Sequence, residues 1–274
     1  MEVYIYVKQM TNLIFKPTVT LPFPNVHRTG TDISVDLLKL GYDNAREEYI
    51  KERFFEGHVP SNIRQLHPII IKFIGAISKK PRSLTLHVSS DYLSLGNDLD
   101  YVRCPISPLT AQTIVDSVNC VLPTIFVVDQ IWQQADIKLT PRPWGPPYNS
   151  SMMSSDRIVK HSHRIDEQLE KYTQYVLKDN LLAGHKKDVV ITNKLKEKPN
   201  AVAIYGWQDY RGIPIQKLYL GHANFYKDYS HGIRLVHREV WTDTDMCIDI
   251  LDAMKDQELF PAFNSEPVTV FRQP

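Results

Sequence analysis

Residues 68–88 read PIIIKFIGAISKKPRSLTLHV and contain two apolar runs separated by a charged turn. The second run alternates apolar and other residues in the pattern LTLHV, which is typical of a strand with one buried face. Lys79, Lys80 and Pro81 lie between the runs, where a turn between two strands is expected. A third strand-like run follows at Tyr101–Ile106, so this region predicts a β-sheet.

Helical periodicity appears on both sides of this region. The stretch DNAREEYIKERFFEG begins at Asp43 with an N-cap residue and places apolar side chains at helical spacing. Ser107 is expected to cap the first of two short helices that form a helical hairpin. A long helix is predicted from Ser155 to a stop at Gly184.

The chain beyond the long helix is rich in strand-like segments. These segments are KDVVITNKL, AVAIYGW, IPIQKLYL and GIRLVHREVW, followed by a predicted helix at 244–255 and a short strand at 268–271. Residues 1–40 contain several prolines and suit an extended arm or edge strand better than a helix. Because helices and strands come in blocks without βαβ alternation, we expect an α+β fold. Its sheet should be mostly antiparallel in the C-terminal half, with the helical hairpin and the long helix packed against it.

The predicted domain boundary is a proline-rich stretch, LTPRPWGPPYNSS, at residues 139–151. Four prolines in this stretch exclude a regular helix or central strand, which leaves a linker or an ordered wall. We predict an N-terminal α+β subdomain over residues 1–150 and a second subdomain over 151–274 that carries the functional site. A single domain is the alternative.

Composition and charge exclude several classes of protein. The 274 residues carry 32 Lys and Arg against 31 Asp and Glu, so no global field attracts a polyanion and no nucleic-acid partner is expected. The apolar runs fall short of the roughly 20 residues that span a bilayer, so no membrane partner is expected. The first fifteen residues lack the order of a secretory signal, which indicates the cytoplasm or a secreted chain whose leader is absent from this sequence. The oligomeric state is left open.

The cysteines do not suggest a disulfide framework or a zinc ribbon. The chain has three cysteines, and each lies beside apolar residues in a segment expected to belong to the core: Cys104, Cys120 and Cys247. We therefore expect buried, inert thiols.

Functional side chains are concentrated between residues 185 and 234. Asp228, Ser230 and His231 occupy a predicted turn before a strand, where polar groups can face a cleft. In the functional interpretation Ser230 is a nucleophile or substrate anchor, His222 or His231 is the general base, and Asp228 orients that base. Arg234 would clamp a carboxylate or an oxyanion. The structural alternative is that Ser and Asp cap turns and that the arginine pairs with an acid.

Residues 230–235, SHGIRL, resemble the SHGC(I/V)RL signature of the L,D-transpeptidases, the YkuD-type enzymes that cross-link cell walls. The nucleophile of that family is a cysteine, whereas here Gly232 is followed directly by Ile233. The His-Gly pair that the family carries upstream is matched only by Tyr205-Gly206, at a longer spacing. The resemblance covers six residues and implies either a related geometry with another nucleophile or a coincidence.

Two further groups of residues extend the candidate site. His185 is a candidate acid or base beside Asp188, although a histidine near a helix end also caps carbonyls without any ligand. The expected substrate-binding residues are Arg234, Tyr205, Trp207, Tyr229 and Lys186.

The histidines also suggest a metal-dependent alternative. Two or three of them with Asp188 or Asp228 would form an open zinc site, and zinc is the cofactor that this alternative requires. His161 and His163 diverge by about 200° on a helix and cannot bind one ion together there. No HExxH spacing occurs, so our first expectation is a site without metal or other cofactor.

The sequence thus favours a hydrolase or acyl-transfer enzyme that acts on a peptide-like or glycan substrate of the cell-envelope type. The competing hypothesis is a non-catalytic peptide- or glycan-binding protein. In that case the proline-rich stretch with Trp144, Trp207 and Tyr205 would grip an extended ligand.

Overall fold

The structure is a computed structural model that describes residues 19–24, 28–172 and 180–273. Its longer helices are α1 (Gly30–Leu37), α2 (Asn44–Phe55), α4 (Pro108–Ser117), α5 (Ile125–Gln134), α6 (Ser155–Leu169) and α7 (Ile250–Lys255). Shorter helical turns are α3 (Ser61–Arg64), η1 (Ser150–Met153), η2 (Glu170–Tyr172), η4 (Asn193–Lys196) and η5 (Phe260–Ala262). No helix in the described ranges is long and apolar enough to cross a membrane.

The strands form two main sheets. In the larger sheet the order is β1 (Val19–Thr20), β2 (Gln65–Ile74), β3 (Pro81–Ser89), β13 (Val236–His237) and β6 (Cys120–Val121), with β14 (Glu239–Thr242) joining β3 to β15 (Cys247–Asp249). In the smaller sheet the order is β11 (Pro214–Ala223), β10 (Ala201–Gln208), β9 (Lys187–Val189) and β12 (His231–Gly232). Two short pairs stand apart: β4 (Ser94–Gly96) with β5 (Tyr101–Arg103), and β7 (Ile137–Lys138) with β8 (Leu182–Ala183).

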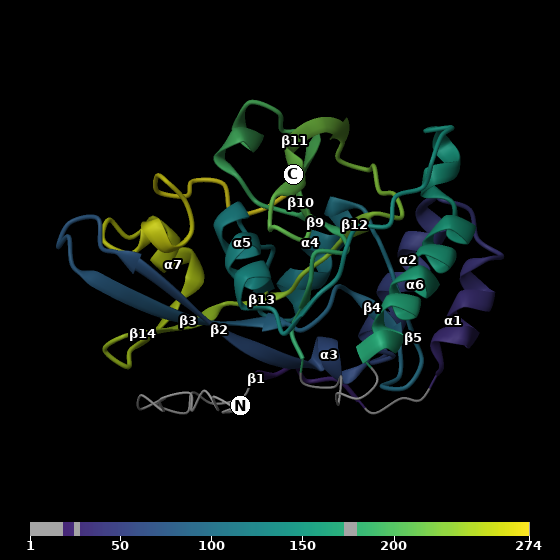
Figure 1. Ribbon diagram of the computed structural model, residues 1–274, viewed down its shortest axis with the longest axis horizontal. Helices are drawn as coiled ribbons and strands as arrows, with labels where there is room; N and C mark the ends of the chain where they lie inside the picture. The colour runs from purple at the N-terminus through teal and green to yellow at the C-terminus, as the bar shows by residue number, and fades with distance from the viewer. Residues whose placement is uncertain (1–18, 25–27, 173–179, 274) are drawn as a thin grey trace, which may run out of the picture.

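The α+β class and the mostly antiparallel pairing are confirmed. The β2–β3 hairpin extends to one end of the molecule, where α7 lies, while α1, α2 and α6 gather at the opposite end (Figure 1). Strands β10 and β11 of the smaller sheet lie above α4 and α5 in this view (Figure 1). Antiparallel sheet is therefore as prominent before residue 150 as after it.

Several predicted elements form for the expected reasons. Asp43 caps α2 by accepting a hydrogen bond from the Ala45 N–H. Ser107 caps α4 with Pro108 in the first turn, and the second predicted helix forms as α5, but the strand β6 between them was not predicted. Each cap satisfies an N–H group that the helix itself leaves unpaired.

The strand predicted over GIRLVHREVW is instead three short strands. β12 pairs with β9 in the smaller sheet, whereas β13 and β14 pair with β3 in the larger sheet. Residues 233–235 therefore carry the chain from one sheet to the other. The sequence pattern of this segment gives no sign of the change of sheet. This crossing connects the candidate site directly to the main core.

Four other expectations were wrong in detail. Residues 30–37 form α1 and are not extended, because Thr29 and Asp32 make a capping box. The helix expected at 244–255 begins only at Ile250, because the preceding residues pair as β15. Residues 268–271 form no strand, since their N–H groups bond to Met254 and to the Asn193 side chain. Cys247 is exposed, while the other two thiols are buried.

The long helix α6 is shorter than predicted. It ends at Leu169 and continues as one turn of η2. Residues 173–179, which the prediction included, lie outside the described residues. The hydrophobic core itself draws on both predicted subdomains, from Leu21 to Val268.

Candidate functional site

Strand pairing brings three separate segments together at β9. Lys187 lies opposite Gly206 on β10 and opposite His231 on β12, where the pairing is parallel. Segments 185–188, 205–208 and 228–232 are thus neighbours, although they span almost fifty residues of sequence. The side chains around this junction form an outer cluster and an inner network, with Lys186 between them.

The outer cluster consists of His222, Tyr226, Asp228, Ser230 and His231. Asp228 is its centre, because it accepts hydrogen bonds from the Ser230 hydroxyl (2.5 Å), the Ser230 N–H (2.8 Å) and the Tyr226 hydroxyl (3.1 Å). The His222 ring stacks on Tyr226 with 3.9 Å between centroids. His222 and Tyr226 are partly exposed, whereas the three residues beneath them are buried.

Charge favours an ionised Asp228. Burial raises the pKa of this carboxyl, but the nearby His231 and Lys187, together with the Ser230 hydrogen bonds, outweigh it and lower the pKa below its usual value. The ionised carboxylate is therefore a strong acceptor for the Ser230 hydroxyl. Asp228 holds that hydroxyl directly, and no histidine lies within hydrogen-bond distance of it in the described residues.

His231 is fully buried, and neither of its ring nitrogens has a hydrogen-bond partner in the described residues. Burial lowers its pKa to about 4, against the opposing effect of Asp228, so the ring is neutral at pH 7. A buried polar group without a partner costs free energy, and such groups in native proteins call for an explanation. A ligand or reacting group can supply the missing partner.

Lys186 is the most unusual residue of the site. Its side chain is fully buried, and Nζ lies 2.6 Å from the Tyr229 carbonyl oxygen and 3.0 Å from His161 Nδ1. No carboxylate lies within ion-pair distance of it in the described residues. Burial, reinforced by Arg103, lowers the pKa of Lys186 to about 7.

The partner of Lys186 comes from α6. His161 is fully buried, while His163 two residues later is exposed, as the helical spacing predicted. Burial lowers the pKa of His161 well below its usual range, and Lys186 adds to this effect. The ring is therefore neutral and accepts a hydrogen bond from the ammonium through Nδ1.

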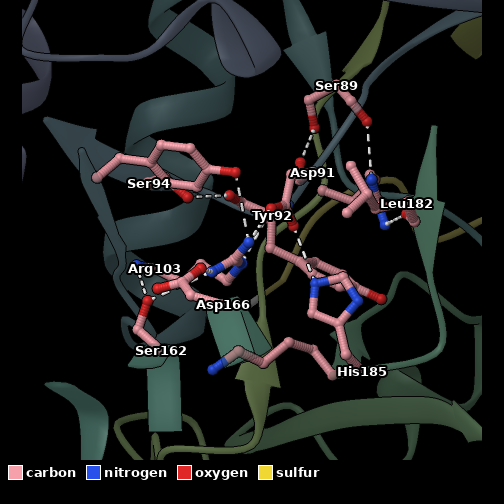
Figure 2. Close-up of polar contacts among 12 residues, drawn as sticks. Ser89, Asp91, Tyr92, Ser94, Arg103, Ser162, Asp166, Leu182 and His185 are labelled. Atoms are coloured by element: carbon pink, nitrogen blue, oxygen red, sulfur yellow. Dashed lines mark hydrogen bonds and ion pairs between the residues drawn. The ribbon is translucent and has the colours of Figure 1, made fainter. Parts of the chain in front are cut away.

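The inner network consists of Asp91, Arg103, Asp166 and His185. Figure 2 shows Asp91 between the other members: His185 Nε2 lies 2.9 Å from Asp91 Oδ1, and Arg103 donates to Oδ2. The same guanidinium reaches Asp166 on α6 at 2.7 Å. Burial raises the pKa of Asp91, but Arg103 and His185 outweigh it, so the pKa falls far below its usual range.

His185 is neutral in this setting. Burial lowers its pKa to about 4 even though Asp91 opposes the shift. Since Asp91 binds Nε2, Nδ1 is left buried and without a partner in the described residues. A carboxylate that fixes one ring nitrogen and leaves the other free is the usual way to orient a histidine base.

Asp188 and Arg234 lie on either side of Tyr92. The Tyr92 hydroxyl donates to Asp188 Oδ2 at 2.8 Å, and burial raises the pKa of Asp188 to about 7. Arg234 lies over the Tyr92 ring and donates to the carbonyl oxygens of Ser89 and Leu182. Each terminal nitrogen of this arginine thus has a backbone partner, and Nε is buried and has no partner in the described residues.

The aromatic candidates occupy different places. Tyr229 and Trp207 pack together with Met152 and Ile158, and Trp144 joins them from the proline-rich stretch. The backbone N–H of Trp144 donates to the Tyr229 hydroxyl at 2.9 Å, so this stretch is an ordered wall beside the site. Tyr205 packs elsewhere, and its hydroxyl bonds to Asp129 on α5.

Trp207 also holds the backbone of the site in place. Its indole N–H donates to the His185 carbonyl, and its N–H donates to the Lys186 carbonyl. The residue has φ of 57°, a conformation that bulky side chains rarely adopt. Such strain persists where surrounding contacts enforce it, and it occurs preferentially at functional sites.

Sequence reasoning missed the residues that bind the histidines. Asp91 follows β3 in a polar run, Ser89-Ser90-Asp91, and this break after an apolar strand was the available signal. Arg103 gave no signal, because its partners lie 12 and 63 residues away.

The metal-dependent alternative lacks a ligand set here. Among the described residues, no three His, Cys, Asp or Glu side chains gather as metal ligands would. Comparison with family models, with curated proteins and with solved structures finds no match for this chain.

Proposed function

We propose that this protein is a hydrolase or acyl-transfer enzyme that acts on a peptide-like or glycan substrate. Its reacting groups would be Ser230, Asp228, His231 and Lys186. The observation that carries the proposal is the fully buried Lys186, which has no carboxylate partner in the described residues and a pKa of about 7. Removing an amine from water without such a partner costs stability, so a role in chemistry is a reason for its presence.

An amine of this kind suits proton transfer near neutral pH. A general acid or base works best when its pKa lies near the operating pH, and desolvation is the usual means of bringing a lysine there. Lys186 Nζ contacts the carbonyl of Tyr229, the residue directly before Ser230. The amine thus lies next to the backbone that carries the hydroxyl.

Ser230 is the proposed nucleophile. Its hydroxyl is oriented by Asp228, which can accept the hydroxyl proton as the serine oxygen bonds to the acyl carbon of the substrate. The bond from that carbon to the leaving nitrogen or oxygen would break, and the leaving group would take up a proton from a general acid, the role we propose for Lys186. His231 and the oriented His185 provide further neutral imidazoles within the same junction. In the resemblance to the L,D-transpeptidases, Ser230 matches the serine of their signature and Ile233 follows Gly232 where their cysteine stands, so a serine nucleophile here would occupy a different position from theirs.

Access to Ser230 runs through the partly exposed members of the outer cluster. Ser230 is 1% exposed, whereas His222 and Tyr226 reach solvent. A substrate would displace this stacked pair and rest against the wall formed by Trp144 and Tyr229. Aromatic walls suit both sugar rings and extended peptides.

The test is a turnover assay with purified cell-wall fragments, short peptides and simple esters, followed by mass spectrometry of the products. We expect Ser230→Ala and Lys186→Met to reduce turnover at least a hundredfold, and wild-type activity to fall as the pH rises, with a midpoint near pH 7, because the general acid must be protonated. Matched controls are Ser117→Ala and the exposed Lys72→Met, which should retain full activity.

Two outcomes would contradict the proposal. Full activity of Lys186→Met would exclude the amine as the proton-transfer group. Saturable binding of the fragments by a folded wild-type protein with no turnover of any substrate would favour the non-catalytic binding hypothesis.

A further inference from the structure

A basic pocket lies where the proline-rich wall meets the end of α6. It has a volume of about 570 Å³ and is lined by residues 141–143 of the wall and by Arg164, Glu167, Gln168 and Lys171 at the end of α6 and the start of η2. Its lining contains three cationic side chains, Arg142, Arg164 and Lys171, against one carboxylate. None of these cations forms an ion pair with another described residue.

Gln168 adds a buried donor to this lining. The side chain is 7% exposed, and Oε1 accepts hydrogen bonds from the Thr140 N–H and hydroxyl. A backbone N–H can only donate, so the oxygen must face Thr140 and the NH₂ group must face away. Nε2 has no acceptor among the described residues and is buried.

Arg164 is held in place by an aromatic ring. Its guanidinium lies 3.3 Å from the centroid of the Trp144 ring, and the backbone N–H of Trp144 donates to the Tyr229 hydroxyl. Stacking fixes the plane of the guanidinium and leaves its edge N–H groups available. The pocket lining therefore combines a guanidinium held by stacking, two further cations and a glutamine whose amide nitrogen has no acceptor among the described residues.

We propose that the basic pocket binds an oxyanion, a phosphate or carboxylate group that forms part of a larger ligand. Arg142, Arg164 and Lys171 supply the positive charge, and the Gln168 amide donates to one of the anion's oxygens. A volume of this size holds more than a single small ion, so the anionic group belongs to a molecule with further contacts. This inference does not depend on the chemistry proposed for Ser230 and Lys186.

The experiment titrates the full chain with inorganic phosphate and, separately, with succinate, at low ionic strength. Binding is followed by calorimetry and by the Gln168 side-chain NH₂ resonance in ¹H–¹⁵N spectra. We expect saturable binding of at least one anion, with a shift of that resonance. A response to phosphate alone identifies a phosphate site, and a response to succinate alone identifies a carboxylate site.

Three variants make the result specific. Arg142→Gln with Lys171→Gln should weaken binding at least tenfold, and Gln168→Glu should weaken it similarly while keeping the acceptor for Thr140. The control, Lys79→Gln with Lys80→Gln, removes the same charge at exposed positions of the β2–β3 turn and should bind as wild type. Absence of saturable binding of both anions, or equal weakening in the two double variants, would overturn the proposal.

Discussion

At the residue scale, buried ionisable groups set the chemistry of this molecule. Lys186, Asp188, His185 and His231 are all fully or almost fully buried, and burial is the largest influence on the pKa of each. Desolvation disfavours the charged form of every group, so the pKa values of the bases fall and that of Asp188 rises. The site therefore holds several groups in their neutral forms, which is the state needed to accept or donate protons near pH 7.

Asp188 gives a testable pH dependence of stability. Its pKa is about 7 in the folded protein and near 3.8 when exposed, so the folded state binds more protons between these values. Stability contributed by this group is present at low pH and is lost as the pH rises through 7. Asp188→Asn keeps an oxygen for the Tyr92 hydroxyl but does not titrate.

We expect the free energy of unfolding of Asp188→Asn, relative to that of the wild type, to grow from pH 4 to pH 8 by a total on the order of 4 kcal/mol. Urea denaturation at intervals of one pH unit measures this difference. A difference that is constant across the range would show that Asp188 is already ionised at pH 5.

At the element scale, one arginine connects α6 to the β4–β5 pair. Arg103 on β5 joins Asp91 to Asp166, and its side chain is fully buried. On α6, His161 binds Lys186, and Ser162 and Asp166 bind Arg103, while residues near the end of the helix line the basic pocket. The helix thus supplies residues to both sites.

Removal of this arginine leaves uncompensated buried charge. We expect Arg103→Leu to lower the free energy of unfolding by about 3–5 kcal/mol, because Asp91 loses its main counter-ion. The control is Arg272→Leu, whose ion pair with Asp116 is exposed and should contribute less than about 1 kcal/mol. Thermal and urea unfolding of both variants would measure the contrast, and equal losses would contradict the role given to Arg103.

Local sequence signals predicted elements well where the cause is local. The caps at Asp43 and Ser107 and the alternation around Leu84 depend on neighbouring residues, and the corresponding helices and strand form. The single strand predicted after Ser230 was wrong, because its breaks arise from pairing with two different sheets. Periodicity carries no information on which partner a strand will find.

The candidate site was predictable to a similar extent. The region 185–234, which the sequence analysis selected for its density of functional side chains, contains the segments that lie together at β9. Their contacts could not be predicted, since Asp91, Arg103 and His161 come from other elements far along the chain. The proposed roles of Ser230 and the histidines in catalysis stay predictions.

At the scale of the whole molecule, the two sheets meet where the chain passes from β12 to β13. The site lies at this junction, so its backbone is fixed by pairing on one side and by the main hydrophobic core on the other. A rigid junction can keep ionisable side chains buried that would otherwise become hydrated or form ion pairs. The net charge of the chain is close to zero, but several of its ionisable groups are buried together at this junction.

The most direct test of the account is the pKa of Lys186 in the folded protein. An NMR titration of the lysine side-chain ¹³Cε resonances, with Lys186 assigned by its absence in Lys186→Met, measures it without a substrate. We predict a midpoint near pH 7 for Lys186, well below the roughly 10.4 of an unperturbed lysine side chain. A Lys186 midpoint near that unperturbed value would contradict the proposed function, because the amine would then be permanently charged at neutral pH.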